Sequence, residues 1–155
     1  WRLGYIAGPA WIADACTKIQ GQVTSGASSF GQKAAAVALE SDHTPTKEMV
    51  IAFHQRRDLI INLLEQIPLL LVNRPQGAFY IFPDVSAYFG RTSTGGYHVK
   101  DADDMSLYLL AEARVSTVSG VAFGNEKCIR LSYATSDEKL KDAAERIRKA
   151  LSILI

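Results

Sequence analysis

Residues 115–134, VSTVSGVAFGNEKCIRLSYA, predict a strand, a glycine-bearing loop and a second strand that carries an arginine. In the second strand, residues 128–133, side chains alternate in character, and the apolar ones that belong against a core are Ile129, Leu131 and Tyr133. Arg130 lies on the opposite face between Cys128 and Ser132, whose small side chains leave space beside it. The segment therefore predicts a half-buried strand with a guanidinium at its centre.

The position of Arg130 has two interpretations. A strand holds a side chain more rigidly than a loop does, and a planar guanidinium held in this way suits bidentate binding of a carboxylate or a phosphate. Arginine is also mostly exposed in proteins, so the residue is equally understood as part of the solvated face of the strand. The strand pattern alone leaves both interpretations open.

Length and charge limit the class of protein. The chain has 155 residues, 48% hydrophobic and 21% charged, which is enough for about one globular domain with a core. Its net charge of +1, with scattered basic residues, predicts no nucleic-acid partner and no anionic membrane surface. The apolar run at residues 59–72 contains polar residues and Pro68, so it predicts no membrane span. Cys16 and Cys128 lack metal-ligand spacing and are expected to be small core residues in a reducing compartment, so we expect a cytoplasmic protein without a metal.

Helical patterns dominate the first half of the chain. Residues 3–7 predict a short strand, and Pro9 suits the first position of the helix that follows. The alanine-rich residues 29–40 predict a second helix. Residues 45–66 predict a helix with Thr44 as its N-cap, long enough to connect two domains.

The second half mixes short strands with helices. Residues 69–73 and 78–82 predict two strands on either side of the turn RPQG, which is compatible with a hairpin. Asp101 is predicted to cap a helix that runs to Arg114, and a final helix is predicted to begin at Ser136. The fold class is therefore α/β, with short strands packed against helices.

Four blocks resemble a known family when they are taken in order. They are WRLGYIAGP, KIQGQVTSGASSFGQKAA, RPQGAFYIFPDVS and EARVSTVSGVAFGNEKCIRLSYATSDEKLKDAAERI. Together they resemble the fold-type I pyridoxal-phosphate aminotransferases of class I, most closely the aspartate and aromatic amino-acid aminotransferases. The resemblance covers essentially the whole chain and corresponds to the last third of such an enzyme. It implies the end of a large cofactor-binding domain at residues 1–44, an inter-domain helix at residues 45–67 and a small C-terminal domain at residues 68–155.

The resemblance assigns roles to two arginines. It implies that Arg130 binds the α-carboxylate of the amino-acid substrate, and that Arg2 contacts the phosphate of the cofactor. The alternative for Arg2 is an ion pair with any nearby acid. Ser119 stands where family members usually have proline, which loosens the entry to the loop and leaves Arg130 untouched.

Other segments remain open between a functional and a structural interpretation. The TSGASS loop, residues 24–29, resembles a segment at the subunit interface near the neighbour's cofactor, or it is a helix-capping linker. Phe79 and Tyr80 resemble residues that line the cleft, or they are ordinary core aromatics.

The resemblance also implies what the printed sequence leaves out. In the family, the lysine that binds the cofactor covalently and moves the substrate proton lies just before the WRxGY block, so it would precede Trp1. The chain opens within a structured pattern, so we expect a fragment that is inactive alone. A large domain would cover the helices at residues 1–44 in the parent protein, so we expect the surface that they expose in the fragment to be unusually apolar. The parent protein would be a homodimeric enzyme that uses pyridoxal phosphate to transfer the amino group of an aspartate-like or aromatic amino acid to a 2-oxo acid.

Two alternatives to this function stay open. Some bacterial transcription regulators carry an aminotransferase-like sensor domain behind a DNA-binding segment, and their C-terminal thirds can resemble this chain. The other alternative is a different fold-type I enzyme, such as an aminocyclopropane-carboxylate synthase or a kynurenine-type aminotransferase.

Overall fold

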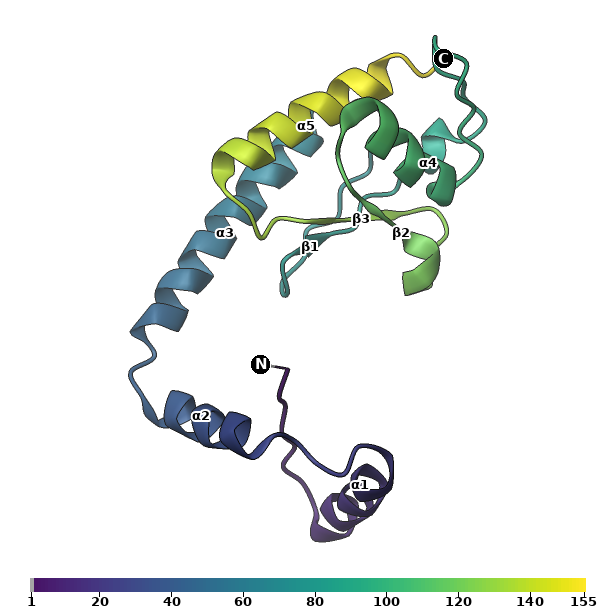
Figure 1. Cartoon of the computed structure of the whole chain (residues 1–155). Helices are drawn as coiled ribbons and strands as arrows, with labels where there is room; N and C mark the ends of the chain where they lie inside the picture. Colours follow the sequence, from purple (N-terminus) through teal and green to yellow (C-terminus); the bar gives the residue numbers. More distant parts are fainter. Residues whose placement is uncertain (1) are drawn as a thin grey trace. The chain divides into compact units, whose positions relative to one another are not determined.

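The computed structural model describes residues 2–155 (Figure 1). The chain divides into two compact units, one that ends at Glu48 and one that runs from Met49 to Ile155. In the described part of the chain, no helix is long and apolar enough to cross a membrane. The same residues contain no group of three or more His, Cys, Asp or Glu side chains placed to bind a metal.

The first unit contains two helices, α1 (Ala10–Val23) and α2 (Ser29–Glu40). Pro9 precedes α1 as its N-cap, one position before the predicted one. The predicted strand at residues 3–7 is wrong, because these residues have no regular structure and nothing in the described part of this unit forms a strand with which they could pair. The helix predicted at residues 29–40 is confirmed.

Apolar side chains of the first unit lie largely on its surface. Gly31 is the one buried residue of its two helices. The exposed large apolar residues include Leu3, Tyr5, Ile6, Trp11, Ile12, Ile19, Val23, Phe30, Val37 and Leu39, with Tyr5 80% and Val23 74% exposed. The expectation of an unusually apolar surface on this segment is therefore confirmed.

The long helix is α3 (Thr44–Leu64). Thr44 is its first residue rather than its N-cap, since the Asp42 carboxylate accepts hydrogen bonds from both Thr44 N (3.0 Å) and Thr44 Oγ1 (2.9 Å). The buried residues of α3 all lie near its C-terminal end, at Ile60, Ile61 and Leu64. Met49, in the N-terminal part of α3, is 56% exposed.

The second unit contains a small antiparallel sheet with the order β1-β3-β2. Its strands are β1 (Tyr80–Ile81), β2 (Val118–Ser119) and β3 (Ile129–Ser132). Residues 69–73 and 78–82 do not form the expected hairpin. The structure has instead a single antiparallel bridge, between Leu71 and Asp84. The reason is local: Asn73 Oδ1 accepts from Phe82 N (2.8 Å) in place of a backbone partner, and Pro75 has no N–H.

Helices close the core of the second unit. Asp101 caps α4 (Ala102–Tyr108), which continues as one turn of π-helix, η2 (Leu109–Ala113), and ends with Arg114 in the left-handed region. Ser136 caps α5 (Asp137–Ser152). The cap at Asp101 is as predicted, and the final helix begins one residue after the predicted start at Ser136. The Tyr108 hydroxyl donates to Ala150 O (2.7 Å), tying α4 to α5. The largest fully buried side chains include Ile61, Leu64, Ile81, Met105, Tyr108, Leu109 and Ile147.

Candidate functional site

Arg130 lies on β3, the central strand of the sheet, as the alternating pattern predicts. The buried face of the strand carries Ile129, Leu131 and Tyr133, whereas Arg130 is half-buried and Ser132 exposed. Cys128 is buried at the point where its backbone forms a bridge with Asp84, which confirms the expected core position, whereas Cys16 is exposed and the same expectation is wrong for it. Burial, assisted by the Asp84 charge, raises the pKa of the Cys128 thiol, so it stays protonated at neutral pH.

Two aromatic rings lie over the Arg130 guanidinium. Its Cζ is 4.3 Å from the centre of the Tyr80 ring and 4.0 Å from the centre of the Phe123 ring. Tyr80 comes from β1, on one side of β3, and Phe123 ends the 3-10 turn η3 (Gly120–Phe123), which follows β2 on the other side. The rings therefore reach the guanidinium from opposite neighbours of the central strand.

The Arg130 guanidinium has no acidic partner in the part of the chain that the structure describes. Among the described residues, no ion pair includes it, and its Nε is buried without a hydrogen-bond partner. By contrast, Arg74 pairs with Glu65 at 3.0 Å and Arg146 with Asp142 at 2.7 Å. A buried donor without a partner costs free energy unless a ligand or water satisfies it, so this cation is suited to binding an anion.

The loop before β3 fixes the position of Phe123. A β-carbon at Gly120 would lie 2.2 Å from Asn125 O and 2.4 Å from Cys128 O, so only glycine allows the backbone to pack this closely. Gly124 ends the turn with φ 79°, and the Phe82 ring meets the Phe123 ring edge-on at 6.3 Å. The aromatic side chain is thereby held beside β3.

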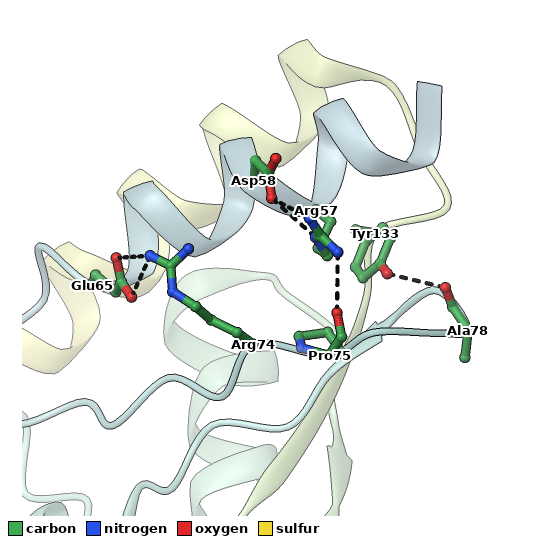
Figure 2. A network of polar contacts seen from close by, with 7 residues as sticks. All are labelled: Arg57, Asp58, Glu65, Arg74, Pro75, Ala78 and Tyr133. Atoms are coloured by element: carbon green, nitrogen blue, oxygen red, sulfur yellow. Dashed lines mark hydrogen bonds and ion pairs between the residues drawn. The ribbon is translucent and has the colours of Figure 1, made fainter. Parts of the chain in front are cut away.

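A network of polar contacts fixes the segment before β1 (Figure 2). Arg57 of α3 donates to Pro75 O (3.3 Å) and pairs with Asp58 at 2.8 Å. Tyr133 donates from its hydroxyl to Ala78 O (3.0 Å), and burial raises the pKa of this hydroxyl, which keeps it a donor. The backbone that leads into Tyr80 is therefore tied to both α3 and β3.

Phe79 and Tyr80, which the sequence analysis considers together, have different partners in the structure. Tyr80 lies against Arg130, whereas Phe79 packs against Phe53 (6.0 Å between ring centres) and against Tyr80 itself (4.5 Å). Sequence reasoning missed Phe123. An aromatic residue between two glycines in the short loop before the arginine strand, GVAFG, was the available signal.

Arg2 belongs to the first unit and Arg130 to the second. Arg2 is exposed, its φ is 61°, and no ion pair within the described residues includes it. Near it in the sequence, Leu3 and Tyr5 border a cavity of about 800 Å³ that the loop residues Ser25 and Gly26 also line. The TSGASS loop thus faces a space within its own unit.

Comparison with known proteins identifies relatives over nearly the whole chain. The model of the family "Aminotransferase class I and II" matches residues 1–147. A bifunctional aspartate aminotransferase and glutamate/aspartate-prephenate aminotransferase of Petunia hybrida is 46% identical over 154 residues, which is 97% of this chain and 32% of that protein. An aspartate/prephenate aminotransferase of Cereibacter sphaeroides is 40% identical over 96% of this chain and 37% of its own length.

Solved structures agree with the observed fold. The crystal structure of an aspartate aminotransferase from Rhizobium meliloti matches 100% of this chain and 39% of its own, with a TM-score of 0.90 and 41% identity. An aromatic aminotransferase from Pyrococcus horikoshii matches 98% of this chain and 39% of its own, with a TM-score of 0.83 and 36% identity. The expected α/β arrangement of helices around a small sheet is confirmed. The chain spans 32% to 39% of the length of the curated relatives that it matches.

Proposed function

Because the chain belongs to the class I and II aminotransferase family, we propose that the protein containing it transfers the amino group of an amino acid to a 2-oxo acid. Enzymes of this family use pyridoxal phosphate. The names of the Petunia hybrida and Cereibacter sphaeroides relatives support aspartate as an amino donor. Aromatic amino acids are the second donor class, supported by the likeness to the Pyrococcus horikoshii enzyme.

The observation that carries the proposal is the unpartnered guanidinium of Arg130. All substrates of the reaction carry a carboxylate next to the reacting carbon, and a rigid fork of N–H donors binds such a group through two parallel hydrogen bonds. Arg130 would therefore hold the substrate in one orientation and present the same bond for reaction in each cycle. The lack of an acid partner for Arg130 among the described residues supports this role.

The residues of the first unit fit the cofactor's phosphate. Arg2 is an exposed guanidinium with no acid partner among the described residues, and guanidinium matches phosphate in geometry and charge. When bound, pyridoxal phosphate supplies the electron sink and carries the amino group between the two half-reactions. The lysine that binds it is expected before Trp1, so the 155 residues alone are expected to be inactive.

The proposed organisation follows the same reasoning. Residues 1–44 would end the large domain, residues 45–67 would connect the domains, and residues 68–155 would form the small domain. The boundary between the two compact units, which falls inside α3, supports this division. The apolar surface of α1 and α2 supports burial against the rest of a homodimeric enzyme. Cys16 and Cys128 are both free thiols, which supports a cytoplasmic location.

The test is Arg130→Lys in the full-length protein, with aspartate and a 2-oxo acid as substrates. An ammonium cannot reproduce the bidentate fork, so kcat/KM should fall. The fall should correspond to a loss of about 2–4 kcal/mol of transition-state stabilisation. Arg146→Lys is the matched control, because Arg146 pairs with Asp142 on the surface of α5. Equal kcat/KM for both variants would contradict the role of Arg130.

A further inference from the structure

The rings on either side of Arg130 determine which anions its guanidinium can accept. We infer that Tyr80 and Phe123 are positioning residues that leave Arg130 open only at the edge of its guanidinium, making it selective for a planar carboxylate over a tetrahedral anion. The inference rests on the proposed function, in which Arg130 binds the substrate carboxylate, and it assigns a task to two further side chains.

Coverage of the guanidinium is the first step of the argument. Ring centres at 4.3 Å and 4.0 Å from Cζ place both rings in van der Waals contact with the guanidinium, so no ligand oxygen fits between either ring and Cζ. The Nε is buried as well. The terminal edge, with Nη1 and Nη2, is the part of the fork that remains for a ligand.

The shape of the ligand follows from this restriction. A carboxylate has two coplanar oxygens, so it meets the terminal edge within the guanidinium plane and accepts two parallel hydrogen bonds. A phosphonate or sulfonate has a third oxygen that projects out of this plane. That oxygen would be directed at the electron-rich faces of the rings, where contact is sterically crowded and electrostatically unfavourable.

The rings also keep the arginine available. Arg57, Arg74 and Arg148 give N–H groups to carboxylates of the same chain. An aromatic face stabilises the cation through its quadrupole and accepts none of the in-plane hydrogen bonds. Tyr80 and Phe123 therefore hold the Arg130 side chain in one position while its donors stay free for substrate.

A purely structural role explains these two rings poorly. Phe123 is 46% exposed and Tyr80 only half-buried, so neither is a core residue. The register of the sheet pairs Tyr80 with Ser132, on the same face as Arg130, whereas Ile81 and Leu131 pair on the buried face. Both rings lie at the surface that a ligand of Arg130 must approach.

The experiment uses the full-length holoenzyme and two inhibitors that carry no amino group. Succinate presents a carboxylate at either end, and ethane-1,2-diphosphonate presents a tetrahedral anion at either end. In Phe123→Leu and Tyr80→Leu, the inhibition constant of succinate should rise by about 5- to 30-fold, the loss expected of one cation–π contact. The ratio of the inhibition constant of the diphosphonate to that of succinate should become smaller in both variants than in wild type.

Replacement by another aromatic residue separates positioning from packing. Phe123→Tyr and Tyr80→Phe restore a ring and should keep the wild-type constants within about twofold. Phe89→Leu is the control, since Phe89 packs against the core and its ring does not lie over Arg130. Thermal unfolding of each variant identifies any that lose the fold.

The outcomes distinguish this inference from the proposed function. If Arg130→Lys weakens succinate binding while both leucine variants bind it like wild type, or no more weakly than Phe89→Leu does, the positioning role is wrong and the proposed function stands. If Arg130→Lys leaves succinate binding unchanged, the proposed function fails and the inference with it.

Discussion

The two compact units place their apolar side chains differently. The second unit, from Met49, buries Ile61, Met105 and Tyr108 in one core, with exposed fractions of 0% to 1%. In the first unit, the helices α1 and α2 leave residues such as Trp11 exposed, and their one buried residue is a glycine. Both units have amphipathic helices, but only one has elements of its own against which the apolar faces pack. A helix pattern thus predicts a buried face without telling whether its partner belongs to the same segment.

The largest expected effect is on hydrogen exchange. In the 155-residue chain, amides of α1 and α2 should exchange at least about a hundredfold faster than those of α4 and α5, because few buried contacts oppose local opening of the first unit. In the longer protein proposed above, a large domain would cover α1 and α2, and their amides should then become protected. Equal protection of both units in the 155-residue chain would contradict the comparison.

A pair of isoleucines tests the same difference by substitution. Ile61 is 1% exposed and Ile19 is 65% exposed. Ile61→Ala should lower the free energy of unfolding of the 155-residue chain by about 2–5 kcal/mol, because it leaves a cavity in the core. Ile19→Ala should change it by less than about 0.5 kcal/mol, and urea unfolding followed by circular dichroism measures both. A large effect of Ile19→Ala would show that the first unit has a core of its own.

Within the second unit, Gly120 should be the least replaceable glycine beside the arginine strand. Gly120→Ala places a β-carbon 2.2 Å from Asn125 O, which forces the backbone apart and should cost about 1–3 kcal/mol of stability. Gly77→Ala is the control, since nothing lies within 4 Å of the added carbon, and its effect should stay within about 0.5 kcal/mol. Equal unfolding midpoints in urea would contradict the close packing of this loop.

Ser119 offers a small gain in the same loop. Its φ of −56° suits proline. Gly120 N donates to Cys128 O (2.7 Å), and hydrogen-bonded pairs alternate along an antiparallel ladder, so the Ser119–Ile129 pair is a non-bonded one. Ser119→Pro should therefore stabilise the unit by about 0.4–1 kcal/mol.

The neighbouring residue provides the control for this change. Val118 pairs with Arg130 at the next position, where its N–H is needed for the ladder. Val118→Pro should therefore destabilise the unit, and thermal unfolding should show midpoints that shift in opposite directions. A fall in the midpoint for Ser119→Pro would mean that its N–H is used.

Particular residues show how far the sequence predicts this molecule. The strand around Arg130 and the caps Asp101 and Ser136 are predictable because burial with period two and helix capping are local effects. The strand at residues 3–7 failed because a strand exists only with a partner, and the described part of its unit has none. The contact of Phe123 with Arg130 depends on the path of the chain through Gly120, which residue spacing does not encode.

The two units also differ in their ion pairs, because every ion pair found among the described residues joins residues from Arg56 onward. The smallest expected effect concerns one of these pairs. Hydrogen bonding from Arg148, together with its charge and that of Lys149, lowers the pKa of Glu145 to about 2. A carboxyl whose pKa is lower in the folded state binds fewer protons there than when unfolded. Its stabilising contribution is therefore complete above about pH 4.5 and is lost as the pH falls toward 2. Glu145→Gln should remove this part of the acid dependence, so its unfolding midpoint should approach that of wild type as the pH falls from 5 to about 2. A constant difference between the two proteins across this range would mean that the exposed pair contributes nothing to the stability of α5.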